Sequence, residues 1–360
     1  MRNRIPTPLL VFLIVLFSTG CQSQESAVHT VRSPTVPFDE LFVLEDTLRL
    51  DPAILIGQII FIDVNPRGEI LVSDYQASIT YLFSSSGDHL QSYSASACLS
   101  DDVFFYPWSA RFLGNEHVVI MQFSGPAVVF NLDGSCYADT KLLTPYAKAI
   151  CTYEDSIFAQ QVWIEEQATA NVYSPMLEKI GEILIEPPRL INLNMYFVGQ
   201  AGRTIDCFDD GPYYLYAESM DAIPVRSSSA GIQYRPDFFE WRPEDLSDAP
   251  PDDENNRRRQ REYPSTIAVF ALNGSTRMVV YGDLDAQWHL SDAHTGGQQL
   301  GLSIASNSKQ FPARSTIPPV YPQGAGNGYF YAAGDNEKLP DGSYGNPVIL
   351  RYKFIPPDEE

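Results

Sequence analysis

The densest group of residues that could carry chemistry lies in the segment Gly282–His294, GDLDAQWHLSDAH. It holds five oxygen or imidazole donors, Asp283, Asp285, His289, Asp292 and His294. Such donors can bind a divalent cation, and Ca²⁺ is the cation best matched to carboxylates. The spacing fits no EF-hand loop, and two histidines five residues apart do not share a helical face. A connecting loop is therefore our main interpretation, with no cofactor expected and Ca²⁺ kept as the alternative.

Known catalytic motifs are absent from the sequence. There is no GxSxG elbow, no HExxH, no GxxxxGK[ST] and no GxGxxG after a strand. The glycines of Gly324–Gly328 lie in a proline-rich stretch before an apolar run, which favours a flexible connection over a phosphate loop. We therefore predict no catalytic residue and lean against an enzyme.

The N-terminal residues 1–20 read as an export signal. Arg2 and Arg4 precede the apolar stretch Leu9–Phe17, which is too short to span a bilayer as a helix. Small residues then lead to Cys21 in a pattern that resembles the lipobox of bacterial lipoproteins, although Ser18 stands where leucine is commoner. The resemblance implies an acylated Cys21, and an ordinary secretory signal is the alternative. Gln22 resembles outer-membrane rather than inner-membrane sorting.

The charge of the chain argues against one class of partner. The formal net charge is −21, and removal of residues 1–20 takes away two arginines and no acid, which makes it −23. Nucleic acid needs a concentrated positive surface, so we expect no nucleic-acid partner. An acidic body also repels anionic lipid, so the N-terminal lipid would be the only membrane attachment.

The segment 57–94 predicts one antiparallel meander. Three apolar runs, Ile59–Val64, Ile70–Val72 and Ile79–Phe83, are separated by Pro-Arg-Gly and polar turns, and a short strand closes the unit. A single meander cannot cover both of its faces, so it needs copies of itself. A second copy spans about 103–143, with an Asp-Gly turn that is a strong hairpin signal.

Weaker copies follow along the chain. Gly87, Gly134 and Gly181 are 47 residues apart, and Gly274 lies 93 further on. A period in the forties is typical of four-stranded propeller blades. We expect 213–217 to be the inner strand of a fourth blade and Ile267–Phe270 its third strand.

The ends of the chain complete the predicted propeller. The strands at 328–333 and 347–354 would form the last blade, and Leu41–Leu44 is a candidate strand to close it. The predicted organisation is a signal peptide at 1–20, a tether at 21–37 and a propeller at 38–356. An irregular insertion is expected around 219–262, where acidic residues, prolines and consecutive arginines occur without an apolar period.

This arrangement resembles the NHL-like six-bladed β-propellers found as lipoproteins in Gram-negative bacteria. The resemblance rests on Gly68–Asp74, read as an inner strand after a glycine turn, and on the strand and turn Ile79–Gly87. It implies an all-β fold of six four-stranded antiparallel blades, with seven blades as the alternative. Closure of such a ring removes exposed sheet edges.

The remaining cysteines, Cys98, Cys136, Cys151 and Cys207, allow three disulfide pairings. We prefer Cys98 with Cys136 and Cys151 with Cys207, since each bond would close about one blade. Four free buried thiols are the alternative.

The expected function follows from the export signal and the propeller fold. We expect a lipid-anchored binding or scaffolding module at the cell envelope, with the outer membrane favoured, that meets an envelope protein or a small ligand through its loops. The alternative is a metal-dependent lactonase or hydrolase with its site in the central channel. Asp74 follows a strand directly and is expected near one channel mouth, with a turn-capping role as the simpler interpretation.

Overall fold

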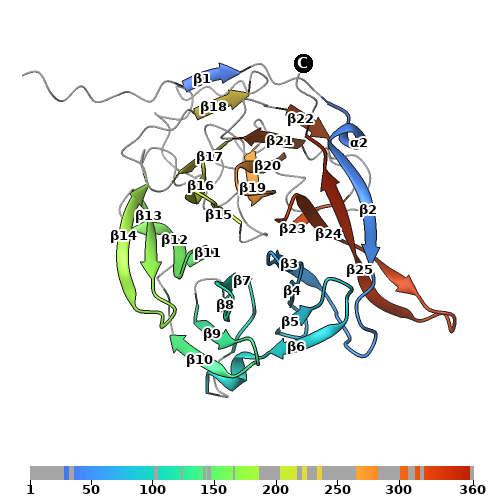
Figure 1. Cartoon of the computed structure of the whole chain (residues 1–360). Coiled ribbons are helices and arrows are strands. Elements are labelled where there is room, and N and C mark those ends of the chain that lie inside the picture. Colours follow the sequence, from blue (N-terminus) through green and yellow to red (C-terminus); the bar gives the residue numbers. More distant parts are fainter. Residues whose placement is uncertain are drawn as a thin grey trace, which may run out of the picture.

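Strands dominate the computed structural model of this chain. The residues it describes are 28–31, 36–100, 104–122, 125–140, 143, 147–164, 167–185, 203–216, 221–224, 233–236, 265–282, 301–306, 313–316 and 320–356. Six antiparallel sheets are arranged around a common centre, as the blades of a propeller are (Figure 1). The predicted six-bladed β-propeller is therefore confirmed.

Three four-stranded blades come first along the chain. Blade 1 consists of β3 (Ile59–Val64), β4 (Ile70–Asp74), β5 (Ile79–Phe83) and β6 (His89–Tyr93). Blade 2 consists of β7 (Ser109–Leu113), β8 (His117–Met121), β9 (Ala127–Asn131) and β10 (Cys136–Thr140). Blade 3 consists of β11 (Ala147–Tyr153), β12 (Ser156–Ile164), β13 (Gln167–Tyr173) and β14 (Lys179–Ile185).

The other three blades are less uniform. Blade 4 has three described strands, β15 (Ile205–Phe208), β16 (Gly211–Tyr216) and β17 (Asp221–Pro224). Blade 5 consists of β19 (Ser265–Ala271), β20 (Thr276–Gly282), β21 (Gly301–Ser306) and β22 (Ala313–Thr316). Blade 6 consists of β23 (Pro322–Gly326), β24 (Tyr329–Lys338), β25 (Tyr344–Phe354) and β2 (Phe42–Leu48), which follows the short helix α2 (Phe38–Leu41).

The ring is completed by both ends of the propeller. The first strands of consecutive blades contact one another in the order β3, β7, β11, β15, β19 and β23, and β23 contacts β3 again. β2, from the start of the chain, pairs antiparallel with β25 from its end. The expected closing strand at Leu41–Leu44 thus lies where α2 meets β2, as the outer strand of the last blade.

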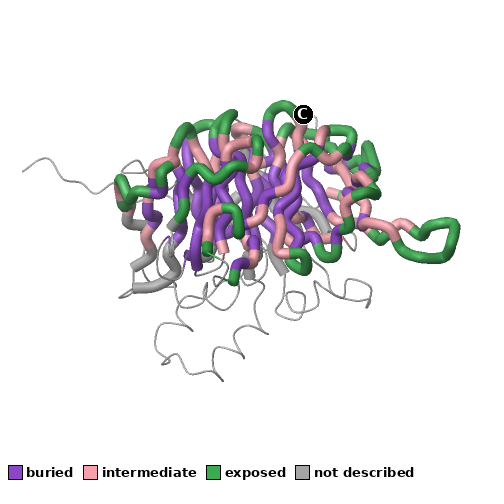
Figure 2. The backbone as a smooth tube through the Cα atoms, turned by 90° about the horizontal axis from the view of Figure 1, so that it is seen from below, coloured by how far each residue is buried: buried purple, intermediate pink, exposed green. Residues whose placement is uncertain are grey.

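The hydrophobic core lies between the blades as a series of layers. One layer joins blades 1 and 2 through residues such as Leu82 and Phe130, and another joins blades 2 and 3 through Val129 and Ile157. Figure 2 shows buried backbone through the middle of the disc and exposed backbone at its two faces.

β4 shows why the second strands of the blades are continuous apolar runs. Ile70 and Val72 belong to the layer between blades 6 and 1, whereas Leu71 belongs to the layer between blades 1 and 2. Successive side chains of a strand point to opposite faces, and here a neighbouring blade covers each face. A strand in this position has no solvent face, so its sequence does not alternate.

The strands predicted to be innermost are in fact the second strands of their blades. Gly68–Asp74 contains β4, and 213–217 contains most of β16, whereas the innermost strands are β3 and β15. Likewise Ile267–Phe270 belongs to β19, which opens blade 5 and is not the third strand of blade 4. The most apolar strand is therefore second, because the first strand carries polar side chains at the axis.

The glycine period has a structural basis at only part of its positions. Gly87 and Gly134 lie in the turn between third and fourth strands with φ of 93° and 84°. Gly181 lies inside β14, paired with Val172, and Gly274 lies between a first and a second strand. The 47-residue spacing from Gly134 to Gly181 therefore does not reflect equivalent positions in two blades.

Two predicted irregular segments contain strands. β1 (Val28–Val31), inside the segment expected to be a tether, pairs parallel with β18 (Gln233–Pro236). β17 and β18 both lie within the expected insertion at 219–262. β17 pairs antiparallel with β16 and so belongs to blade 4. The predicted signal peptide at 1–20 lies outside the described residues. Among the described helices, none has the length and apolar character needed to cross a membrane.

Candidate functional site at the centre of the ring

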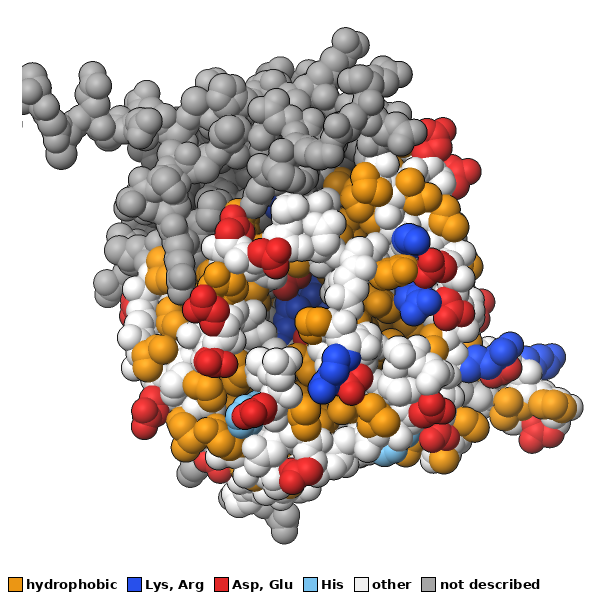
Figure 3. Space-filling view, viewed as in Figure 1, with side chains coloured by type: hydrophobic (Ala, Val, Ile, Leu, Met, Phe, Trp, Pro, Cys, Tyr) orange, Lys and Arg blue, Asp and Glu red, His pale blue; other side chains and the backbone are white. Residues whose placement is uncertain are grey.

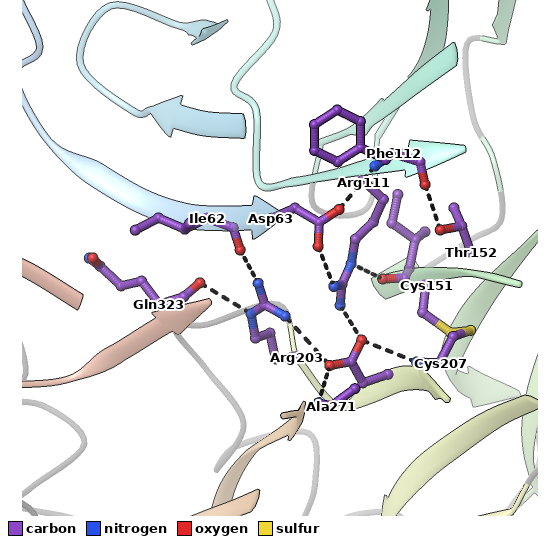
Figure 4. Close-up of polar contacts among 12 residues, drawn as sticks. Ile62, Asp63, Arg111, Phe112, Cys151, Thr152, Arg203, Cys207, Ala271 and Gln323 are labelled. Carbon is purple, nitrogen blue, oxygen red and sulfur yellow. Dashed lines mark hydrogen bonds and ion pairs between the residues drawn. A yellow bond between two sulfur atoms is a disulfide. The ribbon is translucent and has the colours of Figure 1, made fainter. Parts of the chain in front are cut away.

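Four charged side chains lie buried where the six innermost strands meet. Arg203 is fully buried, and Arg111, Asp206 and Asp63 are exposed by only 4, 4 and 9%. Burial of an unpaired charge is very costly, so such groups persist only in mutual contact. Two positive and two negative charges balance in this cluster, which we call the hub (Figure 4).

Arg111 joins the two carboxylates of the hub. Its Nη1 lies 3.0 Å from Oδ1 of Asp63, and its Nη2 lies 3.0 Å from Oδ1 of Asp206. Its Nε donates to the backbone carbonyl of Ile150 at 3.1 Å. The guanidinium of a blade 2 residue thus contacts blades 1, 3 and 4.

Arg203 reaches the other side of the ring. Its Nε donates to the carbonyl of Gln323 at 3.2 Å, and its Nη2 donates to the carbonyl of Ile62. Its Nη1 lies 3.6 Å from Asp206. The guanidinium carbon also lies 4.1 Å from the ring centroid of Phe61 and 4.8 Å from that of Phe270, which adds cation–π attraction.

Both carboxylates also accept hydrogen bonds from the backbone of a neighbouring blade. Oδ2 of Asp63 accepts from the N–H of Phe112 at 3.0 Å, and Oδ2 of Asp206 accepts from the N–H of Ala271 at 2.9 Å. The inner edge of a first strand has no further strand beside it, so buried N–H groups there need side-chain acceptors. The hub supplies them, and through it all six blades share one polar network.

The environment shifts the ionisation of the hub residues. Burial raises the pKa of Asp63, and the nearby Arg111 offsets part of this effect. Burial lowers the pKa of Arg203 to about 9, and the positive charge of Arg111 acts in the same direction. Burial also acts against the charged form of Arg111, but Asp206 and Asp63 outweigh it and raise its pKa. Both guanidinium groups are therefore cationic at neutral pH.

The disulfides lie beside this network. Cys151 of β11 is bonded to Cys207 of β15, and the N–H of Cys207 donates to Asp206 at 3.1 Å. Cys98 is bonded to Cys136 of β10, which ties the connection after blade 1 to the outer strand of blade 2. This is the pairing that we preferred from the sequence.

Asp74, expected near a channel mouth, organises a turn. Its carboxylate accepts from the backbone N–H groups of Gly57 and Gln58 at 2.7 and 3.0 Å, and from those of Gln76 and Ala77 at 2.9 and 3.2 Å. It lies at the end of a second strand and is fully buried. The geometry corresponds to the turn-capping alternative.

The other predicted site residues lie outside the described part of the chain. These are Cys21, Asp283, Asp285, His289, Asp292 and His294. Within the described ranges, no three His, Cys, Asp or Glu side chains come together in a way that could hold a metal ion.

The sequence analysis missed the hub. Its signal was one or two charges inside or just before the first strand of a blade, as in IIFIDV, SARFL and RTIDCF. Within the hub, Arg203 and Asp206 are three residues apart, but the other partners come from different blades, and Arg203 meets a carbonyl 141 residues away.

The surface above the hub is hollowed. Figure 3 shows a depression at the centre of the ring, with basic and acidic side chains at its floor. Turns between first and second strands carry exposed carboxylates, including Glu116, Glu154 and Asp155. Fold and hub together define a six-bladed β-propeller whose axis is filled by a charge-balanced cluster.

Two solved structures share this fold over most of the chain. A protein of Bacteroides fragilis NCTC 9343 that is described as exported is 12% identical, with a TM-score of 0.60, and the match covers 90% of this chain and 98% of that one. A member of the DUF4221 family from Bacteroides vulgatus ATCC 8482 is 9% identical, with a TM-score of 0.54, covering 88% and 99%. No family model and no curated protein matches the sequence. At these identities the likeness is one of fold.

Proposed function

We propose that this chain is an exported, lipid-anchored β-propeller that acts as a binding or scaffolding module at the cell envelope. Three observations support export: the signal-like residues 1–20, the two disulfides, which suit an oxidising compartment, and the fold shared with a protein described as exported. Anchoring through Cys21, with sorting to the outer membrane, is proposed from the lipobox-like sequence alone.

The hub is the observation that carries the binding function. In the hub, the charged groups at the axis form ion pairs with one another and hydrogen bonds with the backbone. These contacts hold the six blades together as one rigid frame. A rigid frame with variable connections at its faces is the usual architecture of a recognition module. Recognition would therefore take place at a face of the disc.

No specific observation favours the alternative of a metal-dependent hydrolase in the channel. Such a site needs carboxylates that converge on a vacant centre. The carboxylates of Asp63 and Asp206 instead lie against guanidinium groups and accept backbone N–H groups. Their oxygens are already used in holding the blades together.

The test combines membrane fractionation with site-directed photo-crosslinking in cells. The full chain, with a photo-reactive residue at Tyr75 or at Glu116, is expressed beside a Cys21→Ala version. These positions lie in turns at opposite ends of the blade strands, because one turn joins β4 to β5 and the other joins β7 to β8.

We expect the chain to fractionate with membranes and to form a discrete adduct from one face only. Cys21→Ala should move it to the soluble fraction. Membrane association that survives Cys21→Ala contradicts the anchor. The absence of any adduct, with protein or with carbohydrate, from positions on both faces contradicts the binding module.

A further inference from the structure

Three aromatic rings form a cluster at one face of the disc, between blades 1 and 2. Tyr75 and Tyr106 are stacked with centroids 4.8 Å apart and an interplanar angle of 19°. Phe104 meets Tyr106 edge-on at 4.2 Å. Phe104 is 67% exposed and Tyr75 is 38% exposed. Exposed large rings in mutual contact are costly to leave in water, and they mark recognition surfaces.

The backbone beneath the cluster is tightly held. Asp74 accepts four backbone N–H groups around Tyr75, and the N–H of Tyr75 donates to the carbonyl of Gln58 at 3.0 Å. The N–H of Tyr106 donates to Oε1 of Gln122 at 3.1 Å, and the intervening Phe105 is buried in the layer between blades 1 and 2. The rings are therefore set in place before any ligand arrives, which lowers the entropy cost of binding.

The described segments that carry or adjoin the rings contain amide side chains and no cationic side chain. The described segments 54–58, 74–79, 94–100, 104–108 and 125–126, together with Gln122, contain no lysine or arginine. The carboxylate of Asp74, next to Tyr75 in the chain, is buried and accepts hydrogen bonds from backbone N–H groups. Within the described part of the chain, no hydrogen bond engages the side-chain nitrogens of Gln58, Gln76 and Gln122.

Exposed aromatic rings beside amide side chains indicate which class of ligand could bind here. Stacked rings accept flat apolar faces, whereas free amide and phenol groups exchange hydrogen bonds with hydroxyl groups. A sugar ring presents C–H groups on one face and hydroxyls at its edge. An anionic ligand would find no counter-charge here, and the acidic body of the chain would repel it.

We propose that the cluster of Tyr75, Phe104 and Tyr106 is a platform for neutral carbohydrate. The inference rests on the proposed binding function and names its ligand class. Because Tyr106 covers one face of Tyr75, a sugar ring would stack on the other face of Tyr75 or against the more exposed ring of Phe104, which meets Tyr106 edge-on. Gln76 and Gln122 would bind the hydroxyls.

A glycan array tests this proposal directly. The probe is a panel of neutral oligosaccharides, with sulfated and sialylated oligosaccharides on the same surface, and the protein is the disulfide-bonded chain without residues 1–21. Tyr75→Ala with Phe104→Ala removes the platform. Tyr344→Ala is the matched control, since Tyr344 is 69% exposed on the hairpin of blade 6, away from the cluster.

We expect the parent chain and the Tyr344→Ala variant to bind a set of neutral oligosaccharides and the platform variant to lose at least about tenfold in affinity. Thermal unfolding of all three proteins shows that each is folded. Binding unchanged in the folded platform variant, or no neutral glycan bound by the parent chain, overturns the proposal. A protein adduct from Tyr75 in cells together with an empty array removes the carbohydrate platform and leaves the binding module intact.

Discussion

At the scale of single residues, the hub shows how charge can hold a ring together. Arg203 is the residue that spans the axis, since its guanidinium contacts backbone from blades 1 and 6 and a carboxylate from its own blade. Asp206 is the counterpart that neutralises it and also faces Arg111. Loss of one partner leaves the others charged and buried, so the cluster behaves as a unit.

Asp206→Asn should therefore be strongly destabilising. Two arginines would then face a single carboxylate in a buried site, and we expect the free energy of unfolding to fall by about 3–5 kcal/mol. Urea unfolding followed by tryptophan fluorescence measures it. Glu182→Gln is the control, because its ion pair with Lys179 is nearly half exposed on both sides and is worth about 1 kcal/mol at most. A loss no larger than that of the control would show that the hub does not stabilise the fold.

These residues also mark the limit of what the sequence could predict. The turns of blade 1 and the Asp-Gly turn of blade 2 depend on neighbouring residues, so the sequence alone could predict them. The contact between Arg111 and Asp63 joins positions 48 residues apart, and it exists only because two blades lie side by side. Charges inside apolar strands could have been noticed, but their partners could not have been chosen from one sequence.

At the scale of elements, the sequence indicated the strands better than their order within a blade. The sequence-based prediction places the most apolar strand of a blade innermost. In a propeller the second strand is covered on both faces by neighbouring blades, whereas the first strand faces the axis and carries the polar residues. The element scale also shows how the ring is completed, since β2 from one end of the chain joins β25 from the other.

Phe42 tests this closing strand. It is 2% exposed and its ring lies 4.9 Å from that of Phe330 and 5.3 Å from that of Phe38. Phe42→Ala should lower the free energy of unfolding by about 3–5 kcal/mol through lost contacts and a cavity. Val43→Ala on the same strand, where the side chain is 45% exposed, should change it by no more than about 0.5 kcal/mol. Equal effects in urea unfolding would mean that β2 does not seal the last blade.

At the scale of the whole molecule, the hub and the apolar layers between blades stabilise the propeller in different ways. The layers between blades hold each pair of neighbours, and the hub holds all six at once. The central polar groups are thereby used for stability, and the proposed recognition would take place at the faces. The proposed carbohydrate platform lies at such a face, on backbone that Asp74 and Gln122 hold in place.

The account depends most on the claim that one buried cluster couples all six blades. Hydrogen–deuterium exchange, compared between the parent chain and Asp206→Asn under conditions where both are folded, measures this coupling directly. We expect amides of β3, β7, β11, β15, β19 and β23 to exchange faster together in the variant, while the exposed turns are unchanged. Faster exchange confined to β15 and its disulfide-bonded neighbour β11 would contradict the claim, because the hub would then be a local contact of blade 4.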